Sequence, residues 1–254
     1  TMVNEIPWSQ QHETRIREAK SSDWLHTYSA DREPPSLALN FRPAPNRPTG
    51  EEAYAKGELK LTAVDRALIT DLYDGELVRL DKALVQLVDA WNRYGHGDGI
   101  VAITSDHGEY LGERGLIGHG VRAFKEVTQI PMVLAAPGRL ETGLKVKTPV
   151  QLRDLYGTLL DLSGIESGHP GSLRPVMKGG ERDGPILARA WPVPVFDKNV
   201  GGEYRFGHRL YREGEKALVL RDDGQAALYN LDTDPDMLKP QVEGLESWLS
   251  LIHI

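Results

Sequence analysis

Cysteine is absent from the 254 residues of this chain, which excludes disulfide bonds and thiolate-based metal or catalytic sites. Basic residues are not in excess either, since 30 Lys and Arg stand against 37 Asp and Glu, for a formal net charge of -7. General nucleic-acid binders show basic patches, so we expect no nucleic-acid partner. No apolar run approaches the roughly 20 residues that cross a bilayer, so we expect no transmembrane segment. The composition, 26% charged and 40% hydrophobic, is that of a globular protein with one large domain or one and a half.

A glycine-rich segment from Thr104 to Gly120 carries the most informative chemistry. It follows the apolar run 100–103, which predicts a buried strand ending at Asp106 and His107. A carboxylate beside a neutral imidazole suits a divalent metal ion. His119 lies thirteen residues after Asp106, close enough in the chain to return to the same pocket. The alternative is an aspartate that caps a turn and a histidine buried by chance.

The same segment carries a family resemblance. Thr104-Ser-Asp-His-Gly-Glu109 resembles the second metal-binding strand of the sulfatases of the alkaline phosphatase superfamily, which typically reads Ser-Asp-His/Asn-Gly-Glu. The Gly112-Glu-Arg-Gly-Leu116 loop, the Gly118-His-Gly120 turn and the strand ending at Pro137-Gly138 follow in the family's order. Near the other end, Leu228-Tyr-Asn-Leu-Asp-Thr-Asp-Pro235 is similar to the family's closing strand and turn.

The resemblance implies roles for particular residues. Asp106 and His107 would be ligands of a divalent cation, with calcium the expected ion and manganese or zinc left open because histidine is a nitrogen ligand. His119 would contact the sulfate or phosphate oxygens and offset charge in the transition state; the alternative is a solvated loop histidine. Glu109, Glu113 and Arg114 are expected to shape the loop. Five other histidines are assigned no role, at positions 12, 96, 169, 208 and 253, and His26 lies near Asp31 in the sequence.

Two features of the family pattern are missing. The family's nucleophile, a Cys or Ser in Cys/Ser-x-Pro-x-Arg, has no counterpart here, and neither do the paired acidic ligands of the first strand. Asp31 stands where the family usually has a histidine near the leaving group. We therefore expect a fragment of a sulfatase that acts on small-molecule or glycan sulfate esters, inactive by itself. The alternatives are a phosphodiesterase or phosphonate monoester hydrolase of the same superfamily, and a non-catalytic member.

The expected fold class is α/β, with a mixed sheet flanked by helices and a small C-terminal antiparallel β subdomain. Residues 1–190 would form part of the sulfatase-like core and 191–254 the subdomain. Apolar periodicity from Leu59 predicts a helix with a bend or break at Asp74-Gly75. The other expected elements are strands at 24–28, 129–136, 185–188, 204–212, 216–221 and 226–231, and helices at 9–22 and 148–164.

Overall fold

The structure is a computed structural model that describes residues 54–57, 60–165, 171–194, 198, 200–241 and 243–251. The strand expected at 24–28, the helix expected at 9–22 and Asp31 lie outside these described residues. The chain divides into two compact units. The first takes in the residues up to Gly97 together with Tyr110–Gly118, and the second takes in Asp98–Glu109 and the residues from His119 onward.

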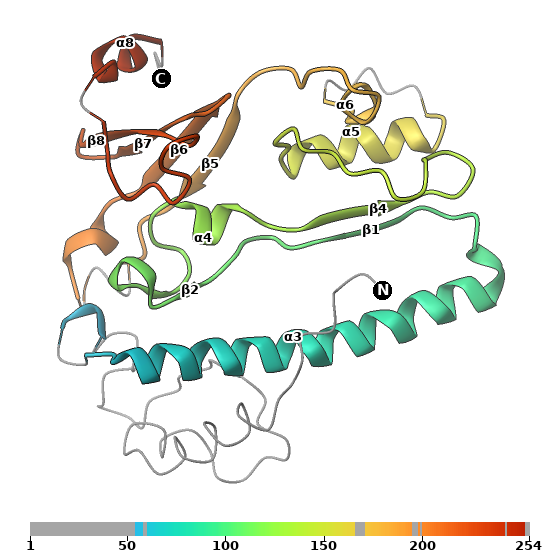
Figure 1. The fold of residues 1–254 in the computed structure, drawn as a ribbon, viewed down its shortest axis with the longest axis horizontal. Coiled ribbons are helices and arrows are strands. Elements are labelled where there is room, and N and C mark those ends of the chain that lie inside the picture. Colours follow the sequence, from blue (N-terminus) through green and yellow to red (C-terminus); the bar gives the residue numbers. More distant parts are fainter. Residues whose placement is uncertain are drawn as a thin grey trace, which may run out of the picture. The chain divides into compact units, whose positions relative to one another are not determined.

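The first unit is dominated by one long helix, α3 (Ala63–Trp91), shown in Figure 1. Thr62 begins it with a capping box: its hydroxyl accepts the Asp65 backbone N–H, and the Asp65 carboxylate accepts the Thr62 backbone N–H. The helix continues through Asp74 and Gly75, so the expected bend or break there is wrong. A glycine inside a helix costs only about 1 kcal/mol relative to alanine, which neighbouring turns can offset.

The same unit holds a short hairpin of two strands, β2 (Tyr110–Leu111) and β3 (Ile117–Gly118). Between them lies a single 3-10 turn, η2 (Glu113–Gly115). The Leu111 backbone N–H donates to the Glu113 carboxylate at 2.6 Å, so Glu113 shapes this loop as expected. Tyr110 is fully buried and belongs to the apolar core of the unit. After α3, a π-helical turn, η1 (Asn92–His96), ends the helical run.

The second unit begins with an antiparallel pair of strands, β1 (Val101–Thr104) and β4 (Met132–Ala135), in a register that places Val101 opposite Ala135. Both strands were expected from the apolar runs. Between β1 and Ile186, the described residues of this unit form the helices α4 (Lys125–Thr128), α5 (Arg153–Leu162) and α6 (Arg174–Met177). Gly164 lies two residues after the last residue of α5, and its φ of +73° and the hydrogen bond from its backbone N–H to the Asp161 carbonyl give it the helix-ending role expected of it.

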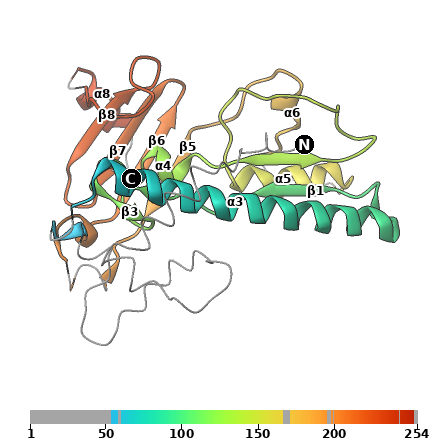
Figure 2. The same cartoon turned by 60° about the horizontal axis from the view of Figure 1, so that its bottom comes forward.

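Four antiparallel strands form the C-terminal sheet in the order β5 (Ile186–Ala190), β6 (His208–Glu213), β7 (Lys216–Arg221) and β8 (Ala226–Asn230). They lie side by side in both views (Figures 1 and 2). One face of the sheet packs Leu218 and Leu228 against Trp248 of α8 (Leu245–Leu251). A 3-10 turn, η3 (Gly202–Arg205), precedes β6.

The expected antiparallel sheet is therefore present. Its strands β5 and β6 lie on opposite sides of the domain boundary expected at residue 191 and pair with each other. The position of that domain boundary stays a prediction. None of the helices in the described residues is both long enough and apolar enough to cross a bilayer.

Candidate functional site

The turn after β1 presents the two predicted metal ligands. Thr104 at the strand end donates its hydroxyl to the Pro131 carbonyl at 2.8 Å, and the Ser105 hydroxyl donates to the His107 carbonyl at 2.6 Å. The Asp106 carboxylate accepts the His107 backbone N–H at 3.0 Å. This hydrogen bond, and then the nearby imidazole of His107, hold the pKa of Asp106 below its ordinary value. Asp106 is thus stabilised as an anion, the form in which a carboxylate binds a cation.

Gly108 fixes the position of this turn. Its backbone N–H donates to the Val127 carbonyl at 2.9 Å. A Cβ atom at position 108 would lie 2.1 Å from the Glu126 carbonyl oxygen, so only glycine fits without a shift of the backbone. The residues on either side, His107 and Glu109, are therefore held against the end of α4.

His107, Glu109 and His119 converge in space. The rings of His107 and His119 stack at 4.0 Å between centroids with an interplanar angle of 30°. The Glu109 carboxylate lies 3.1 Å from His119 Nδ1, and its side chain is only 16% exposed. One ligand atom from each of the three residues can be chosen so that all lie within 4.8 Å of one another. The three side chains form what we call the His-Glu-His cluster.

Hydrogen bonding orients both imidazoles. His107 Nδ1 lies 2.9 Å from the Gly108 carbonyl oxygen, which can only accept, so Nδ1 is the donor in this contact and, in the neutral ring, Nε2 is the atom that has the lone pair. Nε2 of His107 lies 3.6 Å from the Asp106 carboxylate. His119 points its Nδ1 at the Glu109 carboxylate, an acceptor, which leaves Nε2 of His119 for another partner. A carboxylate behind a histidine is the arrangement that orients histidines in metal and catalytic sites.

The distances and the donor types of the cluster favour different ions. Calcium–ligand distances of about 2.3–2.6 Å allow ligands to be up to about 5 Å apart, so the 4.8 Å limit accommodates calcium. Two imidazoles and one carboxylate, however, suit zinc or manganese better than calcium, which prefers oxygen. The residues therefore fit a divalent cation, and the oxygen of Asp106 beside them would favour calcium.

The structure brings two of the three site residues expected from the sequence, His107 and His119, into one cluster and adds Glu109 to them. Asp106 and His107 are neighbours at the strand end, and His119 returns to stack on His107. Asp106 is 85% exposed in its side chain and lies outside the three-residue cluster. Glu109, expected only to shape the loop, contacts His119. The metal and substrate roles of these residues stay predictions.

Comparison with known proteins gives a consistent match. A family model described as Sulfatase matches residues 20–165. A sulfatase from Formosa agariphila is 28% identical over 206 residues, which is 80% of this chain and 36% of that protein. The choline-sulfatase of Rhizobium meliloti is 35% identical over 170 residues, 64% of this chain and 31% of that protein. The chain thus spans about a third of the length of these relatives.

Solved structures show the same fold. The phosphonate monoester hydrolase of Agrobacterium radiobacter matches with a TM-score of 0.61 and 23% identity, over 75% of this chain and 41% of that one. A protein solved in complex with its substrate D-glucosamine-2-N,6-O-disulfate matches with a TM-score of 0.61 and 21% identity, over 79% and 42%. These likenesses confirm the expected α/β fold class of the sulfatase and alkaline phosphatase type.

Proposed function

The chain belongs to the sulfatase family, and from that premise we propose that it forms part of a metal-dependent enzyme that hydrolyses sulfate esters. The observation that carries the proposal is the stacking of His107 on His119 at 4.0 Å, with Glu109 bonded to His119, at the end of a strand. This cluster places nitrogen and carboxylate ligands next to an imidazole that can donate a hydrogen bond. A sulfate ester needs both kinds of group, because its oxygens carry the charge that must be stabilised.

We propose that Asp106 and His107 hold the divalent cation. Asp106 contributes an anionic oxygen, and Nε2 of His107 contributes a lone pair fixed by the Nδ1 contact with Gly108. Calcium is the proposed ion, with manganese and zinc as the alternatives that the two imidazoles support. A bound divalent cation would polarise the sulfate oxygens as a Lewis acid.

His119 is proposed to bind the substrate. Because Glu109 accepts from Nδ1, the Nε2 edge of His119 is the edge available to a sulfate oxygen. When protonated, this edge donates a hydrogen bond to an oxygen whose charge grows as the ester bond breaks. Glu109 also keeps the ring in one orientation, which lowers the cost of forming that bond.

The attacking group is proposed to come from outside these 254 residues. The sequence contains no cysteine and no Ser-x-Pro-x-Arg, so the family's nucleophile has no counterpart in it. Covalent catalysis needs that group as well as the polarising site. We therefore expect the chain to bind a divalent cation without turning over sulfate esters.

The test compares two proteins: the chain as printed and the product of its complete gene. Both are assayed with 4-nitrophenyl sulfate, a phosphate diester and a phosphonate monoester, with calcium, manganese and zinc supplied separately. We expect turnover of the sulfate ester by the complete product only. His119→Ala should lower kcat by about 10²–10³-fold, the scale for one lost transition-state donor, whereas Glu109→Gln should cost less because it retains an acceptor for Nδ1.

Each other outcome has a clear meaning. Robust turnover by the printed chain contradicts the expectation that the nucleophile lies outside it. A preference for the phosphonate ester over the sulfate ester would support the phosphonate hydrolase alternative. If the product of the complete gene binds the ion but hydrolyses none of the three esters, the protein is a non-catalytic member of the family.

A further inference from the structure

An exposed aromatic side chain follows strand β5. Trp191 comes directly after Ala190, the last residue of that strand, and is 64% exposed. The Arg189 guanidinium carbon lies 3.6 Å from the centre of the Trp191 ring, a cation–π contact that covers one face of the ring. Within the described part of the chain, the exposure of Trp191 leaves the other face open. We call this open face the Trp191 platform.

The Trp191 platform is held in one orientation by the residues around it. Side chains two positions apart in an extended chain lie on the same side, which places the Arg189 guanidinium against the ring. That guanidinium also lies 3.9 Å from the Asp222 carboxylate. Two residues after the ring, the Val193 backbone N–H donates to the Tyr204 carbonyl at 3.1 Å. An aromatic ring fixed in this way loses little conformational freedom when a ligand binds to it.

The loop that carries the Trp191 platform touches the turn that carries His119. A Cβ atom at Gly120, the residue after His119, would lie 3.6 Å from Val193 Cγ2, which is ordinary van der Waals contact. From this contact and the spacing of successive Cα atoms, the Cα atoms of His119 and Trp191 are at most about 19 Å apart. A short oligosaccharide can bridge this distance, so a substrate bound at His119 can reach the platform.

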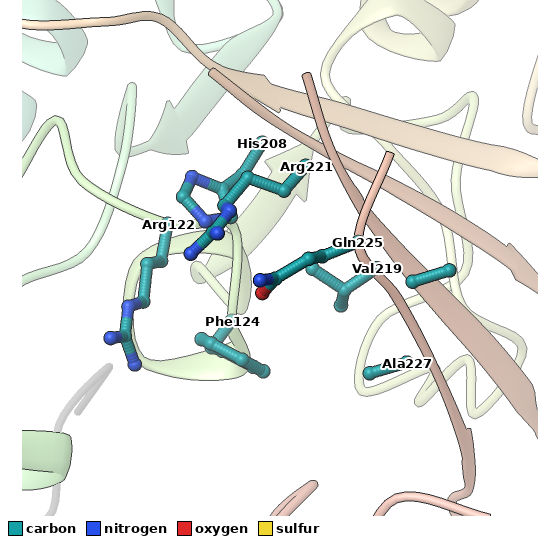
Figure 3. Close-up of a pocket in the computed structure, with 8 residues that line it drawn as sticks. Arg122, Phe124, His208, Val219, Arg221, Gln225 and Ala227 are labelled. Carbon is teal, nitrogen blue, oxygen red and sulfur yellow. The ribbon is translucent and has the colours of Figure 1, made fainter. Parts of the chain in front are cut away.

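The segment after His119 is also anchored to the C-terminal sheet. Phe124 packs edge-on against Tyr229 of β8, with ring centroids 6.1 Å apart at 80°. Figure 3 shows Phe124 facing the strand residues Val219 and Ala227 across a hollow that all three line. The segment from His119 to Phe124 is therefore held at both ends, so the fold sets the distance between His119 and the Trp191 platform.

The chemistry of the Trp191 platform favours a sugar ring. One face of a pyranose presents C–H groups whose hydrogens carry a partial positive charge, and the face of an indole ring is negative. Stacking also removes apolar surface of both partners from water. A cationic group would gain less, because the Arg189 guanidinium already lies against the opposite face and would repel a second cation.

We propose that the Trp191 platform stacks against a sugar ring of the substrate while His119 binds the sulfate ester. The proposal rests on the proposed function, because it names the class of substrate: sulfate esters on an oligosaccharide, rather than those of small alcohols or of quaternary ammonium compounds. Trp191 determines specificity and takes no part in breaking the ester bond. Its removal should therefore weaken substrate binding and leave the chemical step nearly unchanged.

The kinetic test uses the product of the complete gene. The substrates are 4-nitrophenyl sulfate, which carries no sugar, a sulfate ester with a quaternary ammonium group, and a panel of sulfated oligosaccharides from glycosaminoglycans and algal polysaccharides. We expect the lowest KM with an oligosaccharide. Trp191→Ala should raise that KM on the order of 10-fold, the scale of one aromatic stacking contact. The kcat and the KM for 4-nitrophenyl sulfate should stay within about twofold of wild type.

Two further variants separate stacking from a general loss of folding. Trp191→Phe retains an aromatic face and should keep the KM for the oligosaccharide within about threefold of wild type. Trp91→Ala is the matched control, because it removes a tryptophan that is 40% exposed on α3 and should leave that KM unchanged. An oligosaccharide KM that is equal in wild type and Trp191→Ala, or that rises equally in Trp91→Ala, overturns the proposal. A lower KM for the quaternary ammonium ester that depends on Trp191 overturns it in favour of a cation site.

A binding measurement separates this proposal from the proposed function. The chain as printed, which we expect not to hydrolyse the esters, is titrated with the same oligosaccharides while the tryptophan indole N–H signals are followed by NMR. The signal that disappears in Trp191→Phe belongs to Trp191, and we expect it to shift saturably. A saturable shift without turnover of any ester by the complete gene product overturns the proposed function and keeps the platform. Turnover of 4-nitrophenyl sulfate with no such shift and no preference for oligosaccharides overturns the platform and leaves the proposed function intact.

Discussion

Replacing Gly108 by alanine is the sharpest test of how the fold holds the candidate site. The new Cβ atom would lie 2.1 Å from the Glu126 carbonyl oxygen, and ordinary contact begins at 3.4 Å, so the two segments must separate by about 1.3 Å. Such forced shifts cost about 1–3 kcal/mol. The shift would also break the 2.9 Å hydrogen bond from the Gly108 backbone N–H to the Val127 carbonyl, which lowers the stability by about 0.5–1.5 kcal/mol more.

The two costs together give an expected loss of stability of about 1.5–4.5 kcal/mol, which lowers the Tm by roughly 3–18 °C for a chain of this size. It is measured by urea and thermal unfolding followed by circular dichroism. Gly97→Ala is the matched control: its φ is -62°, and among the described residues a Cβ atom at position 97 would meet only the Asn92 side-chain oxygen, at 3.8 Å. We expect that change to stay within about 0.5 kcal/mol.

The same substitution should also weaken cation binding, because His107 and Glu109 flank Gly108 and would move away from His119. Calorimetric titration with calcium, manganese and zinc at a temperature where the variant remains folded measures this effect. A Gly108→Ala protein with unchanged Tm and unchanged cation affinity would refute the argument that this close approach positions the site.

Elements with strong local signals were predictable from the sequence. The turn residues Asp222 to Gln225 separate two runs of β-forming residues, and β7 occupies the predicted range Lys216–Arg221. Gly164 marks the end of α5 because a left-handed residue there is best supplied by glycine. In each case the information lies within a few residues of the feature.

Features that depend on distant residues were not predictable in the same way. The expected break at Asp74-Gly75 followed from local propensity, but the helix continues because its neighbouring turns outweigh one glycine. Glu109 was expected to shape its loop, and its contact with His119 depends on where the chain returns ten residues later. The sequence does contain one indication of the role of Glu109. It lies two residues after His107, and residues with this spacing have their side chains on the same side of an extended segment.

The pairing of His208 with Arg221 illustrates the same limit. His208 was assigned no role, since no metal-binding or catalytic spacing surrounds it in the sequence. Its neighbour Arg221 is thirteen residues away and becomes adjacent only through the β6–β7 register. Phe124 lies much earlier in the chain and contacts the sheet through the ring of Tyr229. A family resemblance based on motifs predicts the strand-end site and does not predict neighbours that are brought together in this way.

Three further predictions concern residues that stabilise the second unit. Arg182→Met should destabilise the chain by about 3–5 kcal/mol in urea unfolding, because the buried carboxylate of Asp154 loses the guanidinium that bonds it at 2.7 Å and keeps only the more exposed Arg153 at 4.0 Å. Replacing both Arg182 and Asp154 by apolar residues should recover much of that loss. Trp248→Ala should cost about 3–5 kcal/mol because its ring fills the core under α8, whereas exposed Trp191→Ala should cost about 1 kcal/mol or less. The last prediction concerns acid. Asp223 has a folded-state pKa of about 2 against an ordinary 3.8, so the folded state favours its anion. Its contribution to stability is present above pH 3.8 and is lost as the pH falls from 3.8 through 2, because protonation then removes the bond to its arginine partner. Asp223→Asn should therefore flatten the dependence of stability on pH between about 4 and 2 and leave the slope above pH 5 unchanged, as measured by urea midpoints across that range. An unaltered acid slope in the variant would show that the arginine contact does not couple Asp223 to folding.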